Sequence, residues 1–409
     1  MEWEILGLFF LATAAAGRTA FSAFALASGA FTLAFTLVAG VLARRFLLAR
    51  APERAATPYP PITLIKPLKG DDLDLDENLA SFCRQDYPCF QILFCLASPD
   101  DPALAAVSRL KKAFPEVDIE VVVSKHRIGY NPKVNNMANA YPFAKYDLLL
   151  MSDSDIRVES GFLRRMAAPF ADASVGLVTS FYQASGARGL WGCMESLSIN
   201  AHFLPQAACA AGFGMRFAMG AAMMVRRQAF EASGGYANLA DHLADDFWLG
   251  ESVREAGWRL ETAEGCVDSV PGIESGVGHF KHLVRWARTI RLCQPAGFYA
   301  SFIQHGFSLL SLRMLIQGPD ALGLVLLSVL WAAKAASAAS LDAGLGRRQP
   351  ARALWLLPLS EWFSFVAWIG ACASNTVVWR GERFVVESQG CLKPVAPAPL
   401  RHALPVDRA

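Results

Sequence analysis

Residues 146–158, YDLLLMSDSDIRV, form an apolar run that ends in two aspartates one residue apart, Asp153 and Asp155. The run from Leu148 to Met151 predicts a short buried strand. Aspartate side chains accept backbone N–H groups at turns and helix N-caps, and a helix-like stretch follows at 161–170, so capping is the default interpretation of a lone Asp-x-Asp. The alternative is a Mg2+ or Mn2+ site. Ligands collect at the carboxyl ends of strands in open α/β sheets, and both ions prefer carboxylate oxygens.

The composition predicts a globular domain joined to membrane segments. The chain has 409 residues, 54% of them hydrophobic and 18% charged, and its mean hydropathy is +0.30. The charged residues concentrate between about 57 and 295, while both ends are apolar. A net charge of +2 argues against a nucleic-acid partner. The nine cysteines include Cys83, Cys89 and Cys95, whose spacing fits no zinc site, so we expect reduced thiols.

The N-terminal region contains one good candidate span. Residues 20–41 carry no charge and are followed by Arg44 and Arg45, a positive flank that predicts a cytosolic end. A cleaved signal peptide is the rival interpretation, and Glu2 and Glu4 argue against it.

Three further apolar segments follow residue 295, at about 298–316, 321–338 and 354–374. Because the first contains Gln304, His305 and Arg313, we expect it to lie at the interface rather than to cross. The tail would then return to the side of the globular domain, and the loop with Arg347, Arg348 and Arg352 would be exported. If all three segments cross, the tail ends on the far side.

The globular middle alternates short apolar strands with helices, which predicts a mainly parallel buried sheet. The predicted helices cover 76–84 and 102–113. The predicted strands are Ile62–Ile65, Ile92–Leu96, Ile119–Val123, Leu148–Met151 and Val175–Phe181.

Polar clusters follow four successive strands of this sheet. Lys66 lies in KPLKG, Asp101 in SPDDPA, Lys133 in GYNPKVNN, and Asp153 in SDSD. One cap per helix is expected, but lysines and carboxylates converging at one edge predict a binding site. For Asp101 alone, which precedes Pro102, capping and binding remain equally good interpretations.

Two later stretches add candidate catalytic groups. In ADHLADDFWLGESVREAGWR, Asp245 and Asp246 begin a helical pattern, either as dipole-stabilising charges or as a general base. In HFKHLVRWARTIRLC, Leu283, Trp286, Ile290 and Cys293 form an apolar stripe beside a basic edge that includes Arg285. That edge suits either lipid phosphates or a substrate diphosphate.

The ordered set of motifs resembles the ceramide glucosyltransferases, membrane enzymes with a GT-A fold, from about Pro60 to Phe384. The segments that carry the resemblance are LIKPLKG, LASFCRQDYP, DDPA, GYNPKVNN, AKYDLLLMSDSDIRV, SGGYANLADHLADDF, VRW and WRGERF. The resemblance implies a Rossmann-like, mainly parallel GT-A domain flanked by N- and C-terminal transmembrane helices. It divides the chain into an anchor (1–50), a catalytic domain (57–295), membrane segments (296–378) and a tail (379–409).

The resemblance also implies roles for individual residues. Asp153 and Asp155 would hold Mg2+ or Mn2+; Asp101, Lys133 and Lys66 would line the nucleotide pocket. Asp246 would be the base. Arg285 would bind the substrate diphosphate, and Trp286 would line the acceptor site. His202 would orient the acceptor or serve as a structural histidine.

Two positions depart from the family pattern. His282 stands where the relatives that polymerise sugars have the Gln of Gln-x-x-Arg-Trp, which favours transfer of a single sugar. Asp155 replaces the glycine of an Asp-Ser-Gly that many ceramide-type members carry.

The expected function is therefore inverting transfer of one sugar from a UDP-sugar, with glucose expected, to the hydroxyl of a ceramide-like lipid at the cytosolic membrane face. The alternatives are a hopanoid- or glycerolipid-directed transferase of the same fold and an inactive membrane scaffold.

Overall fold

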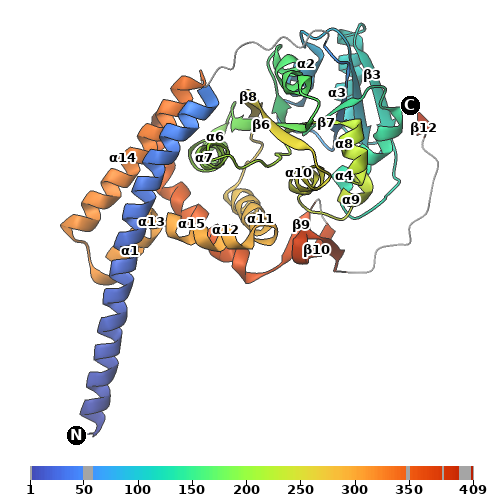
Figure 1. Cartoon of the computed structure of the whole chain (residues 1–409). Helices are drawn as coiled ribbons and strands as arrows, with labels where there is room; N and C mark the ends of the chain where they lie inside the picture. Colours follow the sequence, from blue (N-terminus) through green and yellow to red (C-terminus); the bar gives the residue numbers. More distant parts are fainter. Residues whose placement is uncertain (1, 49–58, 347–350, 380–381, 396–406, 409) are drawn as a thin grey trace.

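The computed structural model of the chain describes residues 2–48, 59–346, 351–379, 382–395 and 407–408 (Figure 1). It has two parts: a globular α/β body and a group of apolar helices at its side, where α1 (Glu2–Leu48) and α14 (Ala321–Gly344) run next to each other.

A nine-stranded sheet forms the centre of the body, in the order β12-β3-β2-β1-β4-β7-β6-β8-β5. The strands β3, β2, β1 and β4 are parallel, and the antiparallel β7 joins them to the parallel pair β6–β8. The strand bounds are β1 Ile62–Pro67, β2 Phe90–Leu96, β3 Asp118–Val123, β4 Leu148–Ser152, β5 Ile156–Arg157, β6 Val175–Ala184, β7 Ala222–Arg226, β8 Arg259–Ser269 and β12 Asp407–Arg408.

Apolar side chains cover both faces of the sheet, as the near-continuous apolar strands predict. Leu64 and Leu150 belong to the core on one face, while Ile65 and Leu149 belong to the core on the other. The five predicted strands and both predicted helices are confirmed, with ends shifted by a few residues. Sequence reasoning does not predict β7, and this strand together with the short edge strands β5 and β12 makes the sheet mixed.

The helices of the body pack on both faces and at the carboxyl edge of the sheet. Their bounds are α2 Leu75–Cys83, α3 Ala103–Ala113, α4 Pro132–Ala140, α5 Phe162–Ala167, α6 Gly189–Leu197, α7 Leu204–Gly212, α8 Arg227–Ala232, α9 Gly235–Leu239, α10 Asp245–Glu255 and α11 Gly276–Cys293. The turns between them are η1 Tyr141–Phe143, η2 Ala168–Ala171 and the π-helical η3 Ser198–Phe203. Beyond α11 lie α12 Pro295–Ala300, η4 Ser301–Gln304, α13 Gly306–Gln317, η5 Ala351–Leu356 and α15 Leu357–Ala373.

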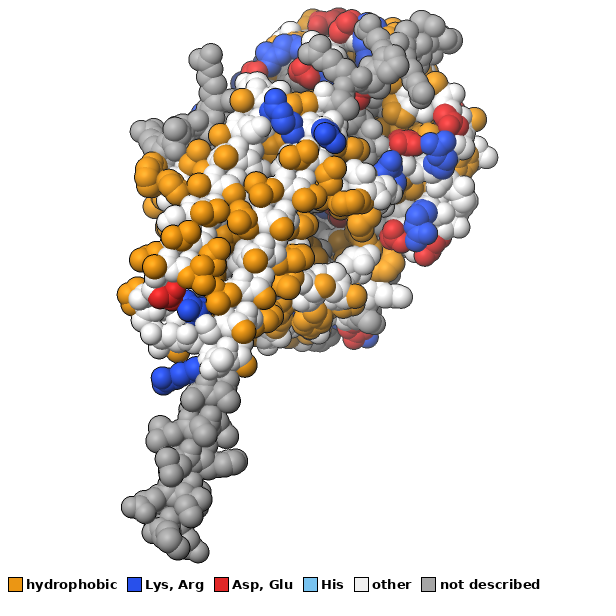
Figure 2. All heavy atoms as spheres, turned by 60° about the vertical axis from the view of Figure 1, so that its left-hand side comes forward, with side chains coloured by type: hydrophobic (Ala, Val, Ile, Leu, Met, Phe, Trp, Pro, Cys, Tyr) orange, Lys and Arg blue, Asp and Glu red, His pale blue; other side chains and the backbone are white. Residues whose placement is uncertain are grey.

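Three helical stretches in the described chain are long and apolar enough to cross a membrane: Gly17–Leu48, Ala321–Gly344 and Ala353–Ala373. Figure 2 shows a broad band of hydrophobic side chains on the outer face of the helical part, with charged side chains gathered above and below the band. Helices of this length and composition suit the apolar core of a bilayer.

The helix α13 runs antiparallel along α1, and α14 then returns parallel to α1. At the start of α13, Gly306 N donates to Thr32 Oγ1 (3.2 Å), whereas at its end the Gln317 side chain donates to the carbonyl of Arg18 (2.8 Å). At the far end of α14, Arg44 donates to the carbonyl of Ser340 (2.7 Å). The C-terminal end of α14 therefore lies beside Arg44 of α1.

Packing along α1 would let 298–316 enter the membrane together with α14, which is the alternative to the interfacial position expected for this segment, and the choice between them stays a prediction. The polar groups that suggested an interface have partners: the Arg313 guanidinium bonds to Ser22 and to Asp320, which also caps α14 through Gly323 N (3.0 Å). Arg313 lies near the Arg18 end of α1, away from the middle of that helix. Arg347 and Arg348 of the basic loop lie outside the described residues.

The segment after α15 folds back onto the globular body as a small antiparallel sheet of β9 (Thr376–Trp379), β10 (Glu382–Val386) and β11 (Leu392–Pro394). Leu243 N donates to the carbonyl of Gly390 (3.0 Å), and Leu392 N donates to the carbonyl of Asp241 (2.7 Å). The turn η6 (Ser388–Gly390) lies between β10 and β11. The described part of the tail is thus on the same side of the helical part as the body.

Candidate functional site

The polar clusters predicted at the strand ends converge at the carboxyl edge of the sheet. Asp153 follows β4, and Lys133 lies in the first turn of α4. The Asn131 side chain caps α4 by accepting from Lys133 N (2.9 Å) and Val134 N (3.1 Å), which fixes the start of this helix. Asp245 and Asp246 open α10. Three separate elements therefore bring their charges to one place.

Lys133 is the central cation of this cluster. Its Nζ lies 2.9 Å from Asp153 Oδ1 and 3.2 Å from Asp245 Oδ2. Burial alone would lower the pKa of Lys133, but the carboxylates of Asp153, Asp245 and Asp246 outweigh it and raise the pKa. The ammonium therefore stays charged and holds the two acidic loops together.

Asp155 occupies a drier position than Asp153. Its Oδ2 accepts a hydrogen bond from Ser269 Oγ (2.8 Å) at the end of β8. Burial, reinforced by the charge of Asp153, raises the pKa of Asp155 to about 6. Two neighbouring carboxylates that repel one another provide the hard oxygen donors that Mg2+ and Mn2+ prefer.

Among the described residues, no group of three or more His, Cys, Asp or Glu side chains is placed to hold a metal ion. The donor set of Asp153 and Asp155 still fits a hard cation that takes its remaining ligands from water and phosphate oxygens. Lys133 already contacts Asp153, so an ion would share that carboxylate with the ammonium.

Lys66 supports this edge from β1. Its fully buried Nζ donates to the carbonyl of Asp153 (2.6 Å) and to Ser152 Oγ (3.3 Å), and it lies 3.8 Å from the centre of the Phe82 ring. Burial lowers the pKa of Lys66 to about 7. The side chain therefore fixes the backbone at the end of β4.

Two backbone N–H groups hold Asp246 with its carboxylate beside Lys133. Gly220 N donates to Oδ2 (2.8 Å) and Phe247 N donates to Oδ1 (2.8 Å). A Cβ at position 220 would lie 3.1 Å from Asp246 Oδ2 and 3.5 Å from Lys133 Nζ, so glycine gives the carboxylate the closest approach. Asp246 is half-buried, whereas Asp245 is buried. Of the two, Asp246 is the carboxylate that a substrate can reach.

The helix α11 closes the site with Arg285 and Trp286. Burial lowers the pKa of Arg285, while the carboxylates of Glu195, Asp153 and Asp246 act in the opposite direction, which places the guanidinium in the same acidic cluster. Trp286 contacts the His282 ring at 4.5 Å between centroids and the Phe203 ring at 6.2 Å.

Glu195 on α6 holds α11 in place by contacting two of its histidines. This buried carboxylate lies 2.8 Å from His279 Nδ1 and 3.4 Å from His282 Nδ1. Sequence reasoning misses Glu195 because a single acid in an apolar helix has no distinguishing pattern. It also misses Tyr182, whose ring stacks on Phe203 at 5.0 Å and whose raised pKa reflects burial first and then the charge of Asp246.

Two predicted site residues have partners outside the cluster. Asp101 Oδ1 accepts from Ala103 N (3.0 Å) at the start of α3 and from Gly70 N (2.9 Å), so it caps a helix and ties down the loop after β1. His202 faces α15, where Nε2 is 3.2 Å from Ser360 Oγ and Nδ1 is 3.4 Å from Glu361 Oε1. The binding roles of both residues stay predictions.

Two other arginines of α11, Arg288 and Arg291, contact protein. Arg288 donates to the carbonyls of Thr376 and Gly370, and Arg291 bonds to Asn375. These arginines fasten α11 to the segment that links α15 with β9, a role different from the lipid-phosphate contact considered from sequence.

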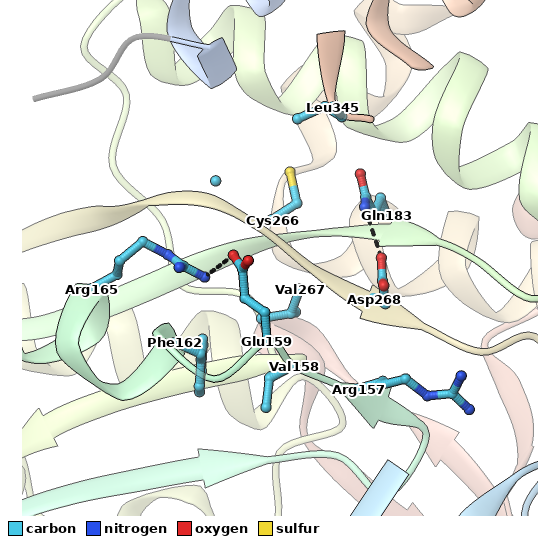
Figure 3. Close-up of a pocket in the computed structure, with 11 residues that line it drawn as sticks. Arg157, Val158, Glu159, Phe162, Arg165, Gln183, Cys266, Val267, Asp268 and Leu345 are labelled. Atoms are coloured by element: carbon cyan, nitrogen blue, oxygen red, sulfur yellow. Dashed lines mark hydrogen bonds and ion pairs between the residues drawn. The ribbon is translucent and has the colours of Figure 1, made fainter. Parts of the chain in front are cut away.

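A cavity of about 280 Å³ lies at the rim formed by β5, β6 and β8 (Figure 3). Figure 3 shows Gln183 hydrogen-bonded to Asp268 and Glu159 paired with Arg165, while Leu345 lies across from Cys266. None of the carboxylates around Lys133 lines this cavity. The charged cluster, rather than this cavity, is therefore the candidate active site.

Comparison with known proteins places the chain in a family. The sequence profile of glycosyl transferase family 21 matches residues 20–392. The chain belongs to glycosyl transferase family 21. It is 31% identical over 238 residues to ceramide glucosyltransferase 3 of Caenorhabditis elegans, covering 57% of this chain and 50% of the relative. It is also 35% identical over 127 residues to a ceramide glucosyltransferase of Komagataella phaffii, covering 29% of this chain and 25% of that protein.

The chain spans about half the length, or less, of these curated relatives. Among solved structures, the mannosyltransferase PcManGT from Pyrobaculum calidifontis, in complex with GDP-Man and Mn2+, is similar with a TM-score of 0.52 and 18% identity. That match covers 86% of this chain and 97% of the mannosyltransferase. The family and this likeness confirm the expected GT-A glycosyltransferase fold with apolar flanking helices.

Proposed function

We propose that the chain transfers one sugar from a UDP-sugar to the hydroxyl of a ceramide-like membrane lipid with inversion at the anomeric carbon. UDP-glucose is the donor we favour, because the family-21 relatives are ceramide glucosyltransferases. The observation that carries the proposal is the cluster in which Lys133 joins Asp153 to Asp245 while Asp246 stays accessible beside it.

In this mechanism Asp246 accepts the proton of the lipid hydroxyl. The acceptor oxygen forms its bond to the anomeric carbon as the bond to the UDP oxygen breaks, and UDP leaves with the electron pair. Two backbone N–H donors fix the orientation of the Asp246 carboxylate, which is the geometry that a general base needs.

Three features of this chain could neutralise the negative charge that develops on the departing diphosphate. Arg285 lies in the acidic cluster with no hydrogen bond or ion pair to its guanidinium within the described residues, so it is free to bind phosphate oxygens. Lys133 supplies a second positive charge. Asp153 and Asp155 would hold a divalent cation, which when bound would neutralise charge on the leaving group.

The identity of the acceptor separates the proposal from its alternative, a hopanoid- or glycerolipid-directed transferase. An inactive scaffold is disfavoured, because it has no need to keep a buried lysine between two carboxylates next to a third.

For the membrane we propose a cytosolic catalytic domain, since Arg44 and Arg45 lie near the end of α1 beside it. We further propose that residues 295–317 and α14 enter and return as one hairpin.

Purified full-length protein in lipid nanodiscs tests the function. It would receive UDP-glucose, UDP-galactose or UDP-GlcNAc with ceramide, diacylglycerol or a hopanoid alcohol, in the presence of Mg2+, Mn2+ or excess chelator. The expected result is one mass-detected product, glucosylated ceramide, that chelator abolishes. Product from diacylglycerol or hopanoid alone would overturn the acceptor assignment. If no combination of donor and acceptor gave a product, the proposed sugar transfer would be overturned.

A further inference from the structure

The loop between α7 and β7 has an exposed apolar tip. Phe213 is 72% exposed and Met215 is 61% exposed, and Arg216 next to them is also exposed. The tip is ordered rather than loose: Gly214 has φ +88°, its N–H donates to the carbonyl of Ala211 (2.9 Å), and Met215 N donates to the carbonyl of Ala210 (3.1 Å). This is a glycine helix end that holds two large apolar side chains away from the protein.

The residues on both sides of the tip are packed against the membrane helices. Ala211 before it and Met219 after it belong to one buried cluster with Ala43 and Leu47 of α1 and Leu341 of α14. Phe217 packs against the same cluster. The ring of Phe181 lies between it and α1, with its centroid 6.4 Å from that of Phe217 and 5.7 Å from that of Phe46.

These contacts set the level of the tip relative to the bilayer. Ala43, Phe46 and Leu47 surround Arg44 and Arg45, the basic flank of the first span. The tip therefore lies where acyl chains give way to headgroups. An apolar pair suits that layer, because the apolar side chains leave water, and the exposed Arg216 braces the tip by donating to the carbonyls of Ala211 (3.0 Å) and Met215 (3.2 Å).

The other end of the same loop reaches the candidate base. Gly220 N donates to Asp246 Oδ2 (2.8 Å), so a few residues of backbone connect the exposed tip with the carboxylate. The loop is thus held against the apolar helices at its tip end and against Asp246 at its other end.

We propose that the tip formed by Phe213, Gly214 and Met215 inserts into the bilayer and delivers the acceptor lipid to Asp246. This inference rests on the proposed function for the identity of the acceptor, but the insertion itself does not depend on it. The partner is the lipid surface, and the tip contacts the acyl chains of the lipid whose hydroxyl is to be glycosylated.

Photocrosslinking tests insertion directly. The full-length protein would carry p-benzoylphenylalanine at position 213 in nanodiscs, and the matched control would carry it at Lys112, an exposed residue on α3 of the globular body. Irradiation should give lipid adducts at position 213, detected by mass spectrometry, and none at position 112. Equal adduct yields at the two positions, or none at 213, would overturn insertion.

Activity tests the delivery step. Because both side chains are exposed, Phe213→Ser with Met215→Ser should fold normally; transfer to long-chain acceptor in nanodiscs should fall about tenfold or more. Transfer to a short-chain acceptor dispersed in water and the KM for donor should stay unchanged, and Phe213→Leu should retain activity. An equal loss on both acceptors, or no loss on either, would refute delivery. A wild type without transferase activity would reject the proposed function while leaving the crosslinking result valid.

Discussion

Replacing Asp246 by asparagine separates proton acceptance from every other property of this side chain. The carboxylate now accepts from Gly220 N and Phe247 N, both at 2.8 Å. An amide keeps the size and one oxygen, so it can satisfy one of these donors while its NH2 group faces the other. An unpaired donor in a half-buried position costs about 1–3 kcal/mol, which should lower thermal stability only modestly.

The effect on turnover should be much larger. An amide cannot take the proton of the acceptor hydroxyl, and losing a general base typically slows the chemical step by about 10²–10⁴-fold. The KM for UDP-sugar should change little, since Lys133, Asp153 and Arg285 stay in place. The assay measures UDP release and lipid product at saturating donor, with donor binding followed separately by calorimetry.

Asp245→Asn is the matched control one residue away. Asp245 is buried against Lys133 at 3.2 Å, and an amide oxygen there still accepts from the ammonium. This variant should lose stability by about 1–3 kcal/mol but keep kcat within about tenfold. If Asp246→Asn retains more than a tenth of wild-type turnover, or if Asp245→Asn suffers the larger loss of kcat, the base has been assigned to the wrong carboxylate.

Three further expectations concern the metal, a buried lysine and the tail. Asp153→Ala should abolish both activity and its dependence on Mg2+ or Mn2+; turnover that persists in excess chelator would contradict a metal role. Lys66 has its pKa depressed by burial to about 7, so its contribution to stability is greatest above its unfolded pKa and is lost as pH falls toward 7. Lys66→Met removes both hydrogen bonds from Nζ at every pH, so the change in thermal midpoint relative to wild type should be more favourable at pH 6 than at pH 9, and an equal change at both would refute the shift. Phe384→Ala, in the core between the tail sheet and the 241–243 loop, should lower kcat about tenfold or more, while Val385→Ala on the exposed face of the same strand should be neutral; equal kcat in both folded variants would show that the tail does not position that loop.

The parts of the site that could be predicted from sequence are those with local patterns. Asp153 follows an apolar strand, and Lys133 follows a proline that begins a helix, so strand-end reasoning correctly brings them together. The same reasoning leaves Asp101 between two interpretations; the structure confirms the helix cap, while its binding role is still a prediction.

What could not be predicted depends on contacts between distant segments. Glu195 binds His279 and His282 across more than eighty positions of sequence, and no periodicity records such a pair. The partners of Arg313 also come from elsewhere in the chain or from the cap of the next helix, so hydropathy alone does not reveal them. The tail sheet shows the same limit, because its partner is the loop before Asp245.

The association of α1 with α13 and α14 also bears on how the chain is assembled. Ser28 Oγ donates to the carbonyl of Ile303 across 275 positions, and Gln317 bonds to Arg18 across 299. At a synthesis rate of 5–20 residues per second, α1 waits roughly 15–60 s for these partners. During that interval the chain from β1 to α11 is synthesised, while the Ser22, Ser28 and Thr32 hydroxyls of α1 lack their later partners. A ribosome stalled before codon 306 would therefore leave an anchored chain whose α1 hydroxyls face lipid without the partners that α13 supplies.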